Sequence, residues 1–465
     1  MQENFSLFSP TDYRYAVEDL RAYLTEEAFV KYKLLVEKAL IKVLARYNFI
    51  SKDIASEITK AIDEVKVQEI YAEEERIRHD IRALVNCVRN KVSAKAKPYV
   101  HLFATSYDIV DNANVLRYKD ATNKVIIPDM IKLIKIFMNL ALRYKDTLQI
   151  GRTHGQHAEP ITFGFAIALY VERWGNRILK LKEATENLVG KFSGAVGSYN
   201  ALSLFFDNPE KFERELLEEL GIRPANISTQ IVPPEPWVDF FHGVISGFSV
   251  LANFADDMRH LQRTEISEIT EEFSPEQVGS STMPQKRNPI NFENVKSMWK
   301  TFVPRMLTLY MDQISEHQRD LTNSCSQRYL PEILVGFCSS IRRMIKVCSN
   351  LNVDRKNLMR NFKLSQDRLI AEPLYIFLAS GGHPDAHEYM RRLTLKAIEE
   401  NVSLSNLIKK DRIIKSYLNK LSPSQKEIIF NPKKYIGIAS QKTKKIVNLW
   451  EDRLKKEKLF DNTSS

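Results

Sequence analysis

The chain has 465 residues, 44% of them hydrophobic, so it can bury a large core and is too long for one compact domain. Its 68 Lys and Arg outnumber 58 Asp and Glu to give a net charge of +10, but both signs are scattered along the sequence. The scatter argues against a dedicated nucleic-acid-binding arm, although a positive field around a cleft would attract an anionic small molecule. Four cysteines without metal-finger spacing predict a reducing compartment. We expect a cytoplasmic protein without an export signal or membrane span.

Helical periodicity dominates the chain. Between residues 167 and 188, apolar side chains recur at steps of three and four, which predicts one long amphipathic helix. Strand-type alternation is scarce, so the sequence predicts an all-α fold with a central bundle of long helices. Further helices are expected at 14–48, 53–97, 128–148, 236–264, 289–317, 327–350 and 440–458.

Turn signals near residues 112 and 364 predict three helical domains, 1–112, 113–363 and 364–465, with the central domain holding the bundle. The few glycines gather at breaks between the expected helices, including Gly151, Gly155 and Gly279. At such breaks the backbone amides are free to meet a ligand.

The most informative stretch is a polar, cationic string at 279–289, Gly-Ser-Ser-Thr-Met-Pro-Gln-Lys-Arg-Asn-Pro. Pro289 stands where a helix begins, so hydroxyls, amides, Lys286 and Asn288 gather at a helix start and predict an anion site. Any single Ser or Lys here would usually be part of a solvated connector. The whole string is far less expected by chance.

This string resembles the signature G-S-S-x-M-P-x-K-x-N-P of the fumarase/aspartase superfamily, and every fixed position is matched. Members of that superfamily cleave a C–N or C–O bond and release fumarate by anti elimination. A second string, Thr-His-Gly-Gln-His-Ala-Glu-Pro at 153–160, is similar to the superfamily's T-H-x-Q-x-A-x-P region. A third, Thr-Ser-Tyr-Asp-Ile-Val-Asp at 105–111, is similar to T-S-x-D-x-x-D.

Several details resemble the adenylosuccinate lyase branch of this superfamily, from about residue 10 to about residue 400. An argininosuccinate lyase typically has leucine where Gly155 stands, and a 3-carboxymuconate cycloisomerase typically lacks a histidine where His154 stands. Two features depart from the branch, namely Gln285 and the segment 232–237, which replaces a stretch that usually carries basic residues. The details that match are Arg14-Tyr15, Arg78-His79-Asp80, the pair His154 and His157, Ser228-Thr229-Gln230, and 319–324 with Arg328.

The resemblance implies a role for each matched residue. Ser280 would be the base that removes the proton next to a carboxylate, and His154 the acid that protonates the leaving nitrogen. Glu293 would be the carboxylate partner of His154. Lys286 and Asn288 would stabilise the doubly charged intermediate, because preorganised cations and donors are effective where charge develops.

The remaining matched residues would bind the substrate. Thr105 and Ser106 would hold the fumarate-end carboxylates, and His79, also assigned to the catalytic set, would orient the nucleotide with its neighbours. The other binding residues implied are Arg14, Tyr15, Asp80, Thr153, Gln230, Ser281, Met283, Arg319, Ser324 and Arg328.

The resemblance further implies a homotetramer with active sites shared between subunits, and no metal or other cofactor. An apolar helix face at 245–254 fits a subunit interface or an intrachain core equally well. The expected reaction is cleavage of adenylosuccinate, and of SAICAR, with release of fumarate. The alternatives are another fumarate-releasing lyase, such as an argininosuccinate lyase, and a non-enzymatic helical scaffold. The intact Ser280, Lys286, Asn288 and His154 argue against the scaffold.

Overall fold

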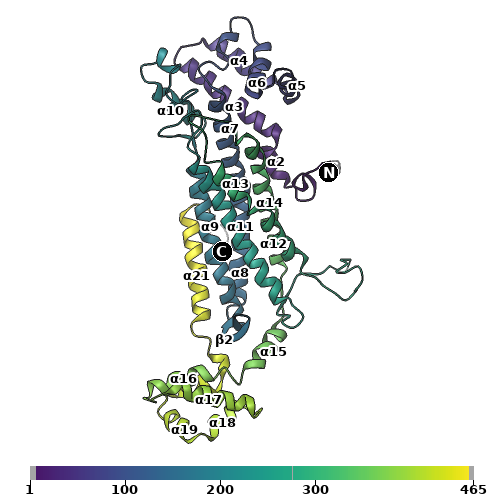
Figure 1. Cartoon of the computed structure of the whole chain (residues 1–465), viewed down its shortest axis with the longest axis vertical. Coiled ribbons are helices and arrows are strands. Elements are labelled where there is room, and N and C mark those ends of the chain that lie inside the picture. The colour runs from purple at the N-terminus through teal and green to yellow at the C-terminus, as the bar shows by residue number, and fades with distance from the viewer. Residues whose placement is uncertain (1–6, 275, 460–465) are drawn as a thin grey trace. The chain divides into compact units, whose positions relative to one another are not determined.

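Helices dominate the computed structural model, which describes residues 7–274 and 276–459 (Figure 1). The only strands in these ranges form three two-stranded sheets. The all-α fold class is therefore confirmed. The chain divides into two compact units, which are 1–130, 177–249 and 297–342 (unit 1) and 131–176, 250–296 and 343–465 (unit 2).

Unit 1 begins with the N-terminal helices, and its sheet pairs β3 with β4 in parallel. Figure 1 shows α3 to α6 clustered together. The elements that lie within unit 1 are α1 (Pro10–Tyr13), α2 (Arg21–Leu24), α3 (Glu26–Arg46), α4 (Lys52–Glu64), α5 (Val67–Ile77), α6 (Asp80–Asn90), α7 (Ser106–Ala121), β3 (Val189–Gly190), α10 (Pro209–Glu219), β4 (Arg223–Pro224) and α13 (Arg305–Met311).

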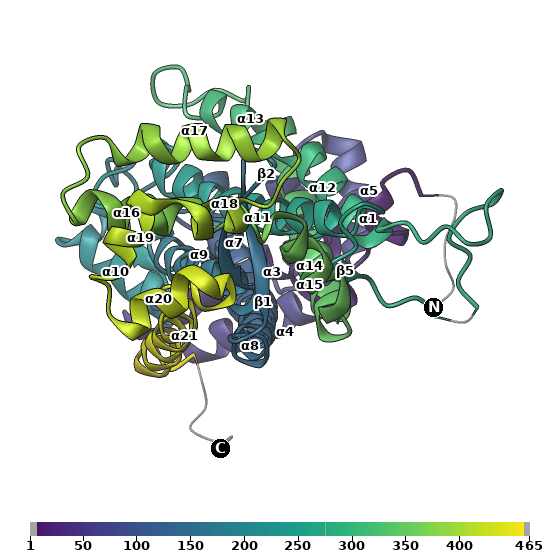
Figure 2. The same cartoon turned by 90° about the horizontal axis from the view of Figure 1, so that it is seen from below.

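Unit 2 contains a hairpin and the C-terminal helices, five of which, α16 to α20, gather around one small core in Figure 2. Its elements are β1 (Leu148–Thr153), β2 (Gln156–Thr162), β5 (Ile269–Thr270), β6 (Asn352–Val353), α15 (Arg355–Ser365), α16 (Ala371–Ser380), α17 (Ala386–Glu399), α18 (Leu404–Lys410), α19 (Arg412–Leu418), α20 (Pro423–Phe430) and α21 (Ala439–Lys456).

The boundaries between the units fall inside helices. The predicted helix at 167–188 is confirmed as most of α9, whereas the three-domain division stays a prediction. The helices with residues in both units are α8 (Ile127–Arg143), α9 (Phe163–Glu186), α11 (Glu235–Leu261), α12 (Ile290–Phe302) and α14 (Ser324–Ser349).

Three predicted helices are wrong as continuous elements. The stretch 14–48 contains α2 and α3, because Thr25 between them is extended. The stretch 53–97 contains α4, α5 and α6, because Val65 and Lys66 are extended and Arg78 has a left-handed φ of 59°. The stretch 289–317 contains α12 and α13, with Pro304 at the N-cap of α13. Proline lacks the amide hydrogen that an uninterrupted helix would use at that position.

The apolar face of α11 is buried within the single chain. Phe248, Leu251 and Phe254 have 0% exposure, so of the two expected roles the intrachain core is the one observed. Phe248 packs against Phe302 and Phe337. By length and composition α11 could also cross a membrane, but 72% of its most apolar window is buried inside the structure, as in the core helix of a soluble protein.

Candidate active site

Unit 1 contains a cavity of about 900 Å³. Its walls come from α3, α5, α6, α7 and the start of α14, together with the N-terminal segment and residue 230. Thr11 and Ala16, which flank Arg14 and Tyr15 in the sequence, also line it. Segments more than two hundred residues apart thus meet in one hollow. The predicted site residues on its walls are His79, Asp80, Ser106, Gln230, Ser324 and Arg328.

His79 and Asp80 are fixed by the start of α6. The His79 Nδ1 atom accepts a hydrogen bond from the amide of Arg82 at 3.2 Å, which leaves Nε2 to carry the proton of the neutral ring. Asp80 is paired with Lys33 Nζ of α3 at 3.2 Å. Burial would raise the pKa of Asp80, but Lys33 and the Ile81 amide outweigh it and hold the pKa below its ordinary value.

Arg319 lies against the first turn of α7. Its guanidinium carbon is 4.3 Å from the Tyr107 ring centroid, Nη2 donates to Tyr107 Oη, and Nη1 donates to Asn323 Oδ1 at 2.7 Å. The Nε atom is buried and has no partner among the described residues. Arg328 is exposed and donates to the Ser324 carbonyl at 2.8 Å. The buried Nε is a donor that a ligand oxygen could satisfy.

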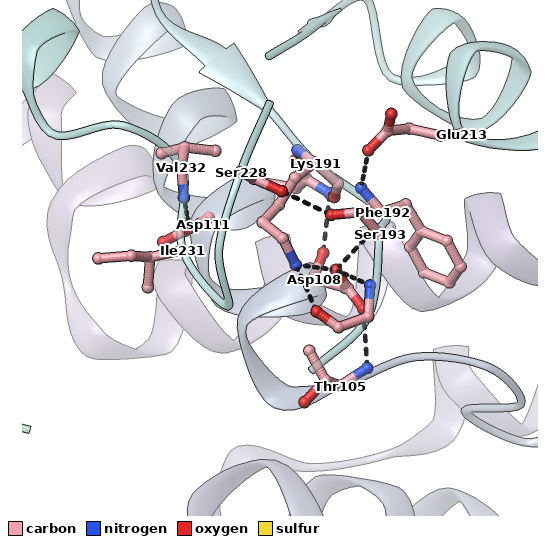
Figure 3. A network of polar contacts seen from close by, with 12 residues as sticks. Thr105, Asp108, Asp111, Lys191, Phe192, Ser193, Glu213, Ser228, Ile231 and Val232 are labelled. Carbon is pink, nitrogen blue, oxygen red and sulfur yellow. Dashed lines mark hydrogen bonds and ion pairs between the residues drawn. The ribbon is translucent and has the colours of Figure 1, made fainter. Parts of the chain in front are cut away.

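The start of α7 is anchored by a buried carboxylate (Figure 3). Asp108 accepts a hydrogen bond from the Thr105 amide at 2.8 Å and forms an ion pair with Lys191, and both side chains are almost completely buried. The Thr105 amide is therefore already used. The Thr105 hydroxyl and the amides of Ser106 and Tyr107, which have no acceptor within the helix, remain for a ligand.

His154 occupies the tip of the β1–β2 hairpin, in an exposed turn. His154 and Gly155 both have a left-handed φ, 53° and 74°, and Thr153 pairs with Gln156 across the turn. Two positive φ values identify the two-residue turn that matches strand twist. The sequence predicts only a break between helices here, although a glycine in second position of a two-residue turn is a hairpin signal.

A buried carboxylate also stands behind this hairpin. Glu268, with 0% exposure, accepts from Arg152 Nη2 at 2.7 Å, from Gln149 Nε2 at 2.8 Å and from Asn361 Nδ2 at 2.9 Å. Strand β1 is thereby tied to α15. The His157 Nδ1 atom lies 2.7 Å from Ser365 Oγ of the same helix, and burial, followed by the charge of Arg152, lowers its pKa.

Ser280 belongs to the open segment between β5 and α12, which extends away from the helices in Figures 1 and 2. Its hydroxyl accepts from the amide of Met283 at 3.1 Å. Asn288 Nδ2 donates to the Gly279 carbonyl at 2.9 Å and closes the loop on itself. Ser280 is half-buried, and the side chains of Ser281, Met283 and Lys286 are exposed.

The helix start behind this loop is already occupied by a carboxylate of the chain itself. Glu271 accepts from the amides of Asn291 and Phe292 at 3.0 and 2.9 Å. An anion at this end of α12, as the sequence predicts, would have to compete with it. Glu293 is exposed, and within residues 7–274 and 276–459 no hydrogen bond joins it to His154, so that pairing stays a prediction.

Comparison with known proteins assigns the chain to a family. Residues 3–301 match the family described as Lyase, and residues 315–427 match the adenylosuccinate lyase C-terminal family. The adenylosuccinate lyase of Pyrococcus horikoshii is 36% identical over 95% of this chain and 98% of its own. That of Archaeoglobus fulgidus is 33% identical over 96% and 99%. The chain belongs to the adenylosuccinate lyase family.

Solved structures agree on the fold. A fumarate lyase from Mesorhizobium sp. BNC1 superposes with a TM-score of 0.82 at 21% identity, covering 93% of this chain and 98% of that one. The 3-carboxy-cis,cis-muconate lactonizing enzyme of Pseudomonas putida has a TM-score of 0.82 at 24% identity, covering 94% and 98%. The expected fumarase/aspartase-like fold is thus confirmed, and the adenylosuccinate lyases are carbon–nitrogen lyases, as expected from the sequence.

The residues that support the candidate site are not evident from the sequence. In the string 105–111 the resemblance gives roles to Thr105 and Ser106 but none to Asp108, and it gives none to Lys191, Glu268 or Lys33. The one available signal was Asp108 itself, an acidic residue three positions after Thr105, which is the spacing of a capping pair. Their partners lie far away in the sequence, so pairing could not be deduced from spacing.

Proposed function

We propose that this chain cleaves adenylosuccinate to AMP and fumarate, and SAICAR to AICAR and fumarate, by general acid/base anti elimination. The observation that carries the proposal is the cavity in unit 1, where six of the predicted substrate residues gather in a chain of this family. A volume of about 900 Å³ is large enough for a nucleotide.

The chemistry requires two proton carriers. Ser280 is proposed as the base, and Lys286 with the loop amides would stabilise its alkoxide once water is excluded. His154 is proposed as the acid because the exposed hairpin tip presents its ring for proton transfer, and Glu293 as its partner. Asn288 and Lys286 would stabilise the aci-carboxylate intermediate.

Different residues are proposed for the two ends of the substrate. The Thr105 hydroxyl and the Ser106 amide are proposed for the carboxylates of the succinyl group. Arg319, with its unpartnered Nε, Ser324 and Arg328 are proposed for the phosphate and ribose. Arg14, Tyr15, His79, Asp80 and Gln230 would orient the nucleotide, and Thr153, Ser281 and Met283 the rest of the substrate.

Incubation of the purified protein with adenylosuccinate, and separately with argininosuccinate, tests the proposal. We expect fumarate only from adenylosuccinate, with AMP as the second product. Fumarate from argininosuccinate would favour the other branch of the superfamily. Absence of fumarate from both would favour a scaffold that retained the fold.

The active sites are proposed to be shared between subunits of a homotetramer. If so, mixing inactive Ser280→Ala chains with inactive His154→Asn chains under exchange conditions should restore part of the activity, because some sites then take one intact group from each chain. Gel filtration must first establish that hybrids form. Hybrids that form and remain inactive would contradict the sharing of Ser280 and His154 between chains.

A further inference from the structure

Three backbone segments of unit 1 are joined by buried polar groups on one face of α7 (Figure 3). The segments are the Thr105–Ser106 turn, the stretch 190–199 and the stretch 228–232. Asp108 and Asp111, three residues apart and therefore neighbours on the helix surface, each hold a different segment. Neither residue has a part in the proposed proton transfers.

Asp108 joins the Thr105–Ser106 turn to the stretch 190–199. One carboxylate oxygen accepts from the Thr105 amide at 2.8 Å, and the other from the amides of Ser193 and Gly194 at 3.2 and 3.3 Å. The second oxygen also pairs with Lys191 Nζ, which donates in addition to the Gly194 carbonyl at 3.2 Å. The buried charge is thus neutralised and fully hydrogen-bonded, which is the condition for a stable buried ion pair.

Asn112, on the same helix, holds the stretch 190–199 in register. Its Nδ2 donates to the carbonyls of Asp108 and Lys191, both at 2.7 Å, and its Oδ1 accepts from the Lys191 amide at 3.1 Å. A Cβ on Gly190 would lie 2.1 Å from Asn112 Oδ1, so only glycine permits this approach. Lys191 therefore reaches Asp108 from a backbone that cannot shift freely.

Asp111 holds the third segment. It accepts from the Val232 amide at 2.9 Å, and four residues earlier Ser228 Oγ lies 2.6 Å from Ser193 Oγ. Gln230, which lines the cavity, stands midway between these two fixed points. The position of Gln230 thus depends on Asp111, whereas that of Ser106 depends on Asp108.

We propose that Asp108, with Lys191, and Asp111 are positioning residues that serve opposite ends of the substrate. Asp108 holds the turn that receives the dicarboxylate end, and Asp111 holds the segment that contacts the nucleotide end. This inference rests on the proposed function. Beyond that function, it predicts that Asp108 affects binding of the dicarboxylate end and Asp111 affects binding of the nucleotide end.

The experiment measures the KM for adenylosuccinate and the dissociation constant of AMP, which carries only the nucleotide end. Asp108→Asn offers one oxygen in place of two and leaves Lys191 unpaired, so the KM should rise about tenfold or more while AMP binding changes little. Asp111→Ala should weaken AMP binding about tenfold, because the Val232 amide loses its acceptor. Asp111→Asn retains an acceptor oxygen and should restore AMP binding.

Asp129→Asn is the matched control. Asp129 is a buried carboxylate of the same unit, on α8, and it accepts from Arg342 Nε at 2.5 Å. It should lower the melting temperature without changing either constant. If Asp129→Asn raises the KM as Asp108→Asn does, or if Asp108→Asn weakens AMP binding as much as it raises the KM, the proposal is overturned.

Should Asp108→Asn fail to fold, Asp108→Asn/Lys191→Met removes both charges and leaves none unpaired. This double variant should fold and still show the raised KM, because its single oxygen cannot serve both segments; a wild-type KM would overturn the proposal. Failure of the proposed function itself is distinguishable, because the wild-type protein would then release no fumarate. AMP binding by the Asp111 variants would still decide the second half of the inference.

Discussion

The start of α7 and the loop that carries Ser280 are supported in opposite ways. Behind Thr105 and Ser106 stands an ion pair that is almost completely buried, with bonds to segments more than eighty residues away. The loop around Ser280 is held mainly by hydrogen bonds within itself, from Asn288 Nδ2 to the Gly279 carbonyl and from the Met283 amide to Ser280 Oγ. Regions with few buried contacts open most easily. The turn proposed to bind the substrate is thus built into the fold, whereas the proposed base lies on a segment that can rearrange.

The largest effect on turnover is expected from replacing the proposed base, Ser280, on the loop. Ser280→Ala should lower kcat by about 10³- to 10⁴-fold, the upper range for general acid/base groups, while AMP binding and the melting temperature stay unchanged. The fold should tolerate the change because Ser280 is half-buried and bonded only to loop amides. The measurements are steady-state kinetics, AMP titration and thermal unfolding.

Thr282→Ala is the matched control for Ser280→Ala, since it removes a hydroxyl from the same loop. Thr282 is exposed, and among the residues that the structure describes its hydroxyl reaches only Ser281 Oγ, at 3.5 Å. Its kcat should remain near the wild-type value. Near wild-type turnover in Ser280→Ala would remove Ser280 from the role of base.

The β1–β2 hairpin is intermediate in how firmly it is held. Its tip is exposed, but the buried carboxylate of Glu268 holds strand β1. His154→Asn should lower kcat by about 10²- to 10³-fold with little loss of stability. Asparagine tolerates the left-handed φ of 53° that this turn position requires. Kinetics and thermal unfolding of the purified variant provide the check.

His157→Asn is the comparison variant for His154→Asn. His157 is half-buried and bonded to Ser365, so its loss should affect stability more and turnover less. A larger loss of kcat in His157→Asn than in His154→Asn would mean that the proton donor is the other histidine.

The sequence predicted the segments of the site better than the bonds that hold them. Each matched string is a short run of sequence and lies at one place in the fold: the signature string in a loop, the Thr-His string at a hairpin turn and the Thr-Ser string at a helix start. Asp108 and Lys191 meet across 83 residues, so no periodicity could pair them. The helix at 53–97 was predicted too long for a different reason. Arg78 adopts a left-handed conformation, which cannot be predicted from an arginine in the sequence.

Asp111 makes the stability of the fold around α7 sensitive to pH. Burial raises its pKa to about 6, above the ordinary value of 3.8. Because the folded pKa is the higher one, Asp111 stabilises the fold fully below about pH 4, and this contribution is lost as the pH rises through about 6.

Asp111→Asn removes this titration. Relative to the wild-type protein, its free energy of unfolding should increase by about 3 kcal/mol between pH 4 and pH 8. Urea unfolding at both pH values measures the difference. If the free energies of unfolding of the two proteins differ by the same amount at both pH values, Asp111 does not titrate in this range.

The smallest expected effect concerns the loop again. A Cβ on Gly279 would lie 2.0 Å from the Lys286 carbonyl, so Gly279→Ala must open the loop that Asn288 closes. We expect the closed loop to be destabilised by about 2 kcal/mol relative to the open loop, which would appear as a roughly thirtyfold fall in kcat. The free energy of global unfolding should be nearly unchanged because the loop is exposed. Gly155→Ala is the matched control: its Cβ would meet nothing within 4 Å, and its φ of 74° alone should cost about 1 kcal/mol. If Gly279→Ala lowers the melting temperature as much as a core substitution would, the loop is part of the cooperative fold and the contrast with the start of α7 is wrong.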